Sequence, residues 1–76
     1  MKLLDEAKIE KLLRARPELA EFWRSPVPLL LIRSRPCRVD PVYEIQLAFD
    51  LGDRLETWRW LWVDALEGRV IRQFPP

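Results

Sequence analysis

The chain of 76 residues contains no histidine and no asparagine, and it has only one cysteine and two glycines. Without histidine, and with Cys37 as the single thiol, the sequence excludes a Ser-His-Asp triad, a Cys-His pair and a thiolate or imidazole metal site. One cysteine also excludes an internal disulfide, so Cys37 is expected to be a reduced thiol. We therefore expect no catalytic residue, no cofactor and no metal, and a protein that is not an enzyme.

A strong excess of charge is missing as well. Thirteen basic residues against twelve acidic ones leave a net charge of +1, which gives little attraction to phosphate backbones or anionic membranes. No apolar run is long enough to cross a bilayer, and Asp5 and Glu6 occupy the place of an apolar signal core. These features predict a cytoplasmic location. The lack of asparagine, the seven prolines and the preference for arginine over lysine are typical of a thermophile or of a GC-rich bacterial genome.

The length and the 49% hydrophobic content predict one folded domain over residues 1–76 with a small core. The first part, residues 1–25, is expected to be helical. Apolar residues follow helical spacing from Leu4 to Leu13, and Pro17 suits the first position of a second helix that ends before Pro26. We expect these two segments to form a helix–turn–helix pair in the plain structural sense.

The second part, residues 27–75, is expected to form an antiparallel sheet. Residues 27–33 form an apolar run between prolines, 42–50 and 55–65 alternate between apolar and polar residues, and 69–74 form a last short strand. The turn residues Asp50, Asp53 and Asp64 are expected to bond local backbone N–H groups, and Gly68 can take a positive φ. The predicted fold class is α+β, with the helix pair packed on a three- or four-stranded antiparallel sheet.

Tryptophan is the most unusual feature of the strand at residues 55–65. Strict alternation would place Trp58, Trp60 and Trp62 on one face, roughly 7 Å apart. If that face packs on the helices, the three rings are core. If the opposite face, with Leu61 and Val63, is the core, the rings form an exposed row for a partner or a second copy. The sequence leaves both alternatives open.

Arginines cluster at residues 33–38, where Arg33, Arg35 and Arg38 could contact phosphate or carboxylate groups. Together with the tryptophans they would suit single-stranded nucleic acid. No basic stripe accompanies the aromatic residues, however, and a solvated loop is the favoured interpretation. Nucleic acid is therefore the alternative partner, and unchanged tryptophan fluorescence on adding an oligonucleotide at low salt would argue against it.

The segment from Val63 to Ile71, which reads valine-aspartate-alanine before a glycine turn, resembles the terminal hairpin of PepSY-like domains. The strand Val42–Leu47 is similar to the central tyrosine-containing strand of that family, and Glu6-Ala7 and Arg16–Leu19 are similar to its helical region. One repeat of the beta-lactamase inhibitor protein fold also resembles the expected architecture. The resemblance implies a binding or inhibitory module and supplies no catalytic residues.

The sequence thus predicts a small non-catalytic protein-interaction module, a regulator or inhibitor of a larger protein, that forms a homodimer or binds another protein without contacting a membrane. Aromatic residues and arginine are the side chains that most often anchor interfaces. The predicted interface residues are Tyr43, Trp58, Arg59, Trp60 and Trp62.

Overall fold

The structure is a computed structural model that describes residues 2–34 and 41–76. Helix α1 (Glu6–Arg14) begins after Asp5, whose carboxylate accepts a hydrogen bond of 2.8 Å from the backbone N–H of Lys8 and so caps the helix. Of the apolar residues with helical spacing, Ile9 and Leu13 are fully buried and face inward, whereas Ala7 and Leu12 are exposed.

The second helical segment is shorter than a regular helix. It consists of a 3-10 turn, η1 (Pro17–Leu19), followed by α2 (Ala20–Trp23). A helix of one turn has little intrinsic stability, so packing must hold it in place. Phe22 supplies that packing: it is fully buried, and its ring lies 4.9–5.5 Å from the rings of Trp23, Phe49 and Trp58.

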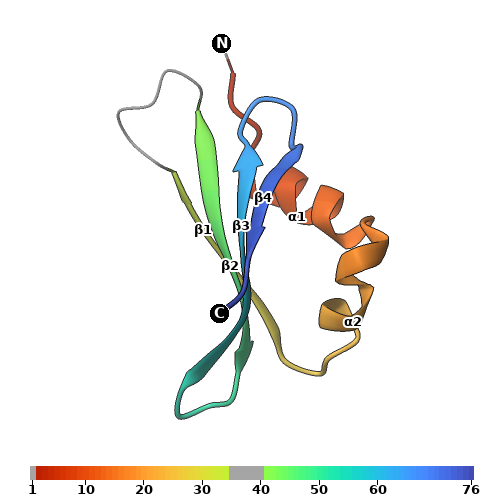
Figure 1. Ribbon diagram of the computed structural model, residues 1–76, viewed down its shortest axis with the longest axis vertical. Helices are drawn as coiled ribbons and strands as arrows, with labels where there is room; N and C mark the ends of the chain where they lie inside the picture. The colour runs from red at the N-terminus through yellow and green to blue at the C-terminus, as the bar shows by residue number, and fades with distance from the viewer. Residues whose placement is uncertain (1, 35–40) are drawn as a thin grey trace.

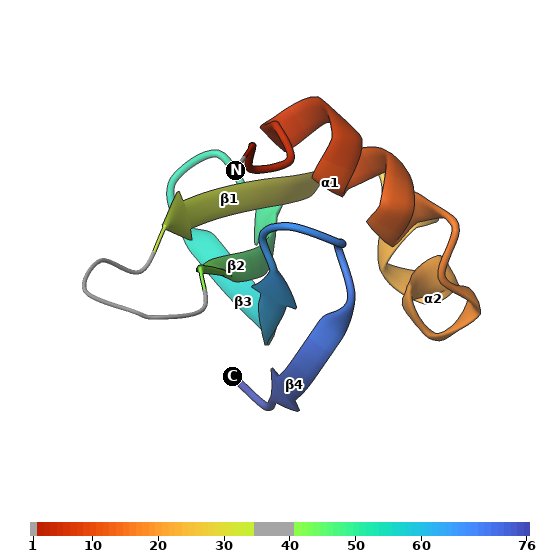
Figure 2. The same ribbon diagram turned by 90° about the horizontal axis from the view of Figure 1, so that it is seen from above.

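Four antiparallel strands follow: β1 (Pro28–Ser34), β2 (Val42–Asp50), β3 (Leu55–Asp64) and β4 (Val70–Phe74). Their order in the sheet is the order of the sequence, β1-β2-β3-β4. The helices lie on one side of this sheet, as Figures 1 and 2 show. The predicted α+β class with an antiparallel sheet is therefore confirmed, and the apolar run at residues 28–34 supplies the fourth strand.

The core lies between the helices and the sheet. Its eight largest side chains, all with 0% exposure, are Ile9, Leu13, Leu19, Phe22, Ile45, Leu47, Leu61 and Val63. Ile45 and Leu61 are direct cross-strand partners, so they point to the same face of the sheet. This pairing identifies the face of β2 and β3 that the helices cover.

The pairing of β2 with β3 contains a bulge. Leu47 pairs with Arg59 and the next residue, Ala48, pairs with Thr57, which leaves Trp58 as an extra residue in β3. A bulge of this kind breaks the strict alternation of side chains along the strand. Trp58 and Arg59 therefore both point toward the helices, whereas Trp60 and Trp62 point to the other side.

The two tight turns use Asp50, Asp64 and both glycines, whereas the carboxylate of Asp53, which was also expected to bond local backbone, lies 3.4 Å from the guanidinium of Arg54. Gly52 and Gly68 have φ angles of +91° and +78°, a region that favours glycine. Asp50 accepts a hydrogen bond from the N–H of Gly52 at 3.0 Å, and Asp64 accepts one from the N–H of Leu66 at 2.8 Å. The prediction that these two aspartates bond local backbone groups is confirmed.

The segment before α1 is fastened to the sheet through the backbone of Leu4. Its N–H donates to the carbonyl of Ala65 at 2.8 Å, and its carbonyl accepts a hydrogen bond of 2.7 Å from the hydroxyl of Tyr43. Gly68 lies under the same segment, because a Cβ added there would stand 2.3 Å from Leu12 Cδ1 and 3.2 Å from Leu4 Cδ1. Residues from the two halves of the chain therefore close the end of the core together.

Candidate interaction surface

The face of the sheet opposite the helices, which we call the open face, has no helix over it in the described part of the chain (Figure 2). Side chains that alternate with the core positions form this face. In rows across the sheet they are Arg33, Glu44, Trp62 and Arg72; then Leu31, Gln46, Trp60 and Phe74; then Leu29, Ala48 and Thr57.

Aromatic rings gather at the β3–β4 side of the open face. The rings of Trp62 and Phe74 meet edge to face with centroids 5.2 Å apart, and Trp60 is the direct cross-strand partner of Phe74. All three side chains are half-buried within the chain itself. Leu29 and Leu31 are a second apolar area, on β1, and the polar side chain of Gln46 on β2 lies between Leu31 and Trp60.

Polar groups on the open face make hydrogen bonds with one another. The amide nitrogen of Gln46 donates to the hydroxyl of Thr57 at 2.7 Å, and the indole nitrogen of Trp62 donates to Glu44 Oε2 at 3.4 Å. These bonds fix the polar side chains between the apolar ones. A partner that covers this face would therefore need to offer hydrogen-bond partners to the remaining polar atoms of Gln46 and Glu44.

Charged groups of both signs lie at one end of the open face. Arg33 and Arg72 are exposed on β1 and β4, and Glu44 lies on β2 in the same row. The guanidinium of Arg72 lies 5.3 Å from the centroid of the Phe74 ring. The face therefore combines an aromatic cluster on β3 and β4 with a mixed-charge rim at one end, and aromatic residues and arginine are enriched at protein–protein interfaces.

The bulge divides the predicted interface residues between the two faces. Trp60 and Trp62 lie on the open face, as expected if Leu61 and Val63 form the core side of the strand. The expectation that Trp58 shares their face is wrong: its ring stacks on Phe22 at 5.4 Å and packs against the core. The expectation of a single row of three tryptophans fails because one extra residue in β3 reverses the alternation.

Arg59 and Tyr43 also lie on the side of the helices. The guanidinium of Arg59 stands 4.1 Å from the Trp58 ring centroid and donates to Gln73 Oε1 at 3.1 Å. Tyr43 is the cross-strand partner of the buried Val63 and reaches Leu4 through its hydroxyl. The geometry therefore gives both residues packing roles within the chain, away from the open face.

Of the predicted anion contacts, Arg33 is at the exposed end of β1. Arg35 and Arg38 lie outside the described residues. The open face also includes Leu29, Leu31 and Phe74, which are not among the residues predicted from the sequence. Alternation within residues 28–34 and 70–74 indicates which residues of each strand share a side. Only the register between strands shows that Leu29, Leu31 and Phe74 lie on the same face as Trp60.

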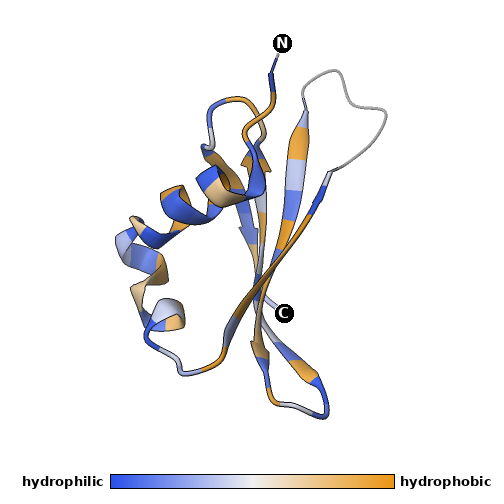
Figure 3. Ribbon diagram, turned by 180° about the vertical axis from the view of Figure 1, so that it is seen from behind, coloured by the Kyte–Doolittle hydropathy of each residue, from blue (hydrophilic) through white to orange (hydrophobic). Residues whose placement is uncertain are grey.

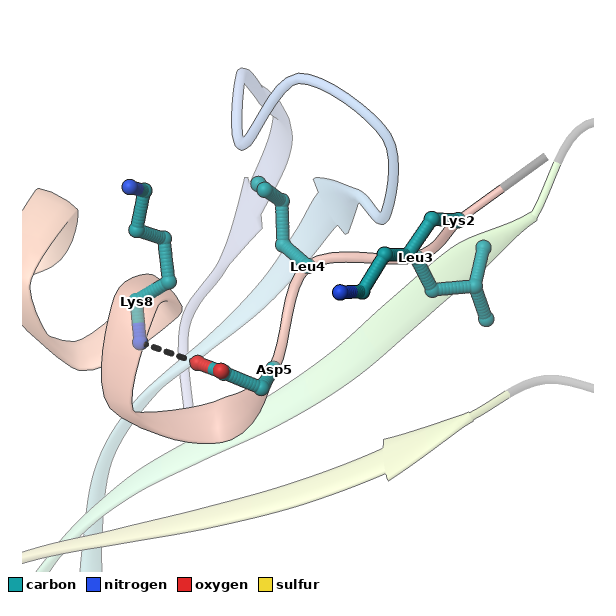
Figure 4. A pocket seen from close by; sticks show the side chains of 5 residues that line it. All are labelled: Lys2, Leu3, Leu4, Asp5 and Lys8. Carbon is teal, nitrogen blue, oxygen red and sulfur yellow. Dashed lines mark hydrogen bonds between the residues drawn. The ribbon is translucent and has the colours of Figure 1, made fainter.

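A shallow pocket of about 190 Å³ lies beside the N-terminal segment and is lined by Lys2, Leu3, Leu4, Asp5 and Lys8. Figure 4 shows that the amino groups of Lys2 and Lys8 do not converge on a common point. The carboxylate of Asp5 is already engaged as the cap of α1. The pocket therefore offers no arranged set of groups for a ligand.

Local hydrogen bonds shift the pKa of two exposed side chains, Glu18 and Arg69, which lie in turns near the helices and after β3. The backbone N–H of Glu18 and the side chain of Arg16 hydrogen-bond the Glu18 carboxylate and lower its pKa. The side chain of Glu67 accepts a hydrogen bond of 2.6 Å from Arg69 and raises the pKa of that guanidinium. Neither arrangement adds a reactive group to the open face.

Within residues 2–34 and 41–76, no three Cys, Asp or Glu side chains are grouped so that they could hold a metal ion. Over the same ranges, no helix is both long enough and apolar enough to cross a membrane. Comparison of the chain with protein-family models, with curated proteins and with solved structures finds no match. The resemblance to PepSY-like domains stays a prediction.

Proposed function

We propose that this protein is a small non-catalytic interaction module that binds another protein through its open face, as a regulator or inhibitor of that protein. The observation that carries the proposal is the position of Trp60, Trp62 and Phe74 on the face that no described helix covers. An aromatic surface of this kind marks binding sites more often than it marks a free protein surface.

The rim indicates what kind of partner fits. Arg33 and Arg72 lie at one end of the open face, with Glu44 between them. A partner with an apolar centre and a carboxylate opposite either arginine would match this pattern. Glu44 and Asp50 on the same face would repel a phosphate backbone, which favours a protein over single-stranded nucleic acid.

The test compares proteins retained from a cell lysate by the wild type and by Trp60→Ser. We expect Trp60→Ser to stay folded and to lose a retained protein that the wild type binds in a fixed ratio. Leu3→Ser is the matched control, because Leu3 is exposed by 42% on the N-terminal segment, away from the open face. The proposal fails if Trp60→Ser and Phe74→Ser retain the same proteins as the wild type, or if Leu3→Ser loses them equally.

A further inference from the structure

The two long edges of the sheet differ in how well they are protected against pairing with another strand. β4 has five residues, a register shift in its pairing with β3, and the polar residues Arg72 and Gln73, and it is followed by Pro75 and Pro76. Short length, a bulge, charge and proline all discourage strand addition. The adjoining part of β3 has its own bulge at Trp58.

β1 has none of these devices along its centre. It pairs with β2 in one unbroken register over seven residues, and Leu29 to Ile32 form a continuous apolar run, orange in Figure 3. Among the described residues, no element pairs with its other edge. A long, regular and apolar edge of this kind is a template for another strand.

The backbone groups that β1 offers follow from its register. Asp50 N donates to the carbonyl of Val27 at 3.0 Å, so residue 27 belongs to a hydrogen-bonded pair with β2. Hydrogen-bonded and non-bonded pairs alternate along an antiparallel ladder. Leu29, Leu31 and Arg33 therefore direct their backbone groups to β2, whereas Leu30, Ile32 and Ser34 direct theirs to the outside.

We propose that β1 pairs antiparallel with β1 of a second copy, about a two-fold axis that passes through Leu31. In this register Leu30 of one copy and Ile32 of the other exchange both backbone hydrogen bonds. The N–H of Ser34 donates to the carbonyl of Pro28 of the second copy. Pro28 lacks an N–H, and it falls at the end of the ladder, where the loss is smallest.

Closure favours a second copy as the occupant, and charge does not oppose it. The register places Arg33 beside Leu29 of the second copy, so the two Arg33 side chains start roughly 13 Å apart along the strands. That separation exceeds the screening length of about 8 Å at physiological salt. Because the axis uses the same edge of both copies and the opposite edge is protected, assembly stops at a dimer instead of continuing as a fibre.

The dimer goes beyond the proposed function, because it uses the edge of the sheet and leaves the open face free. Pairing of the two β1 strands would join two four-stranded sheets into one, with both open faces on the same side. Leu29 and Leu31 of both copies would then meet at the middle of that surface. A partner bound on the open face would find two copies of the aromatic cluster related by the two-fold axis.

Disulfide trapping tests the register in a Cys37→Ser background. Residues facing each other in a non-bonded antiparallel pair have Cα atoms about 4.5 Å apart, within reach of a disulfide. We expect Leu31→Cys to form a covalent dimer under mild oxidation and Leu29→Cys, whose thiols would be roughly 13 Å apart, to stay reduced. Efficient trapping by Trp60→Cys with no trapping by Leu31→Cys would overturn the proposal and show that copies meet through the open face.

A charge-swap experiment tests whether position 31 pairs with itself. We expect Leu31→Lys and Leu31→Glu, each folded by circular dichroism, to be monomers by light scattering, because like charges would face each other across the axis. Mixing the two variants should restore a dimer. Dimers that persist in both single variants, or a wild type that is monomeric at high concentration, would refute the pairing. Trp60→Ser should stay dimeric, so the dimer test and the test of the open face can fail independently.

Discussion

The division of the tryptophans by the bulge in β3 predicts that two neighbouring substitutions have unequal costs. Trp58→Ala removes a ring that stacks on Phe22 at 5.4 Å and lies under the Arg59 guanidinium at 4.1 Å. Trp60→Ala removes a ring that is also half-buried but lies on the open face, where among the described residues no other ring stacks on it. The two substitutions remove the same side chain from strand positions two residues apart.

The expected magnitudes follow from burial. A fully buried Trp→Ala change costs about 3–5 kcal/mol, and the partial exposure of Trp58 brings this to roughly 3 kcal/mol. Trp60→Ala should cost roughly 1 kcal/mol, from the part of its ring that rests on neighbouring side chains. The whole chain of 76 residues is stabilised by only about 4–11 kcal/mol, so the first change removes a large share of its stability.

The assay is urea unfolding followed by far-ultraviolet circular dichroism, because both variants alter tryptophan fluorescence. With a slope near 1 kcal/mol per molar urea, a difference of about 2 kcal/mol separates the two midpoints by about 2 M. All three proteins must be compared at one concentration, since association shifts apparent stability. Equal costs, or a larger cost for Trp60→Ala, would refute the assignment of Trp58 to the core side and Trp60 to the open face.

Two further predictions concern the turns. Gly68→Ala and Gly52→Ala should each lower stability by roughly 1–2 kcal/mol in thermal unfolding, because both glycines have positive φ. A Cβ at Gly68 also meets the terminal methyl groups of Leu12 and Leu4, but Leu12 is exposed by 37% and can move aside, so a loss at Gly68 far above that at Gly52 would contradict this reasoning. For Glu18, proton titration by NMR should give a pKa below its ordinary value of 4.5. Because its pKa is lowered, the ionised Glu18 carboxylate stabilises the fold above its ordinary pKa, and this stabilisation disappears as the pH falls through the lowered pKa. Glu18→Gln should remove this contribution to the pH dependence of stability. A pKa at or above 4.5 would contradict the hydrogen bonds to the Glu18 carboxylate.

Periodicity predicted the first helix and the strands, whereas the expected helix–turn–helix pair is not confirmed, because its second member is a 3-10 turn followed by a single helical turn. The strand at residues 42–50 alternates cleanly and is found with those bounds as β2, and the apolar run before it forms β1. Pro17 marks the start of the second helical segment as expected. Local patterns are informative here because each element buries one face against the same core.

The positions of the tryptophans could not be predicted in the same way. The bulge follows from how β2 and β3 fit together over the core, and neither glycine nor proline marks it at Trp58. One extra residue reverses every later side chain, so the strict alternation that identified the strand gave the wrong face for Trp58. Likewise, Phe74 joins Trp60 only through the register between β3 and β4, which depends on residues far apart in the sequence.

The attachment of Leu4 to Ala65 has a consequence for how the chain folds during synthesis. The residues of α1 are synthesised early. The carbonyl of Ala65, which binds the N–H of Leu4, and the turn at Gly68, which lies beside Leu12, are synthesised much later. Contacts of such high sequence separation slow folding. The buried residues of α1 therefore stay exposed to chaperones and proteases until most of the sheet has left the ribosome. We expect the chain to reach its native structure in one late step rather than element by element.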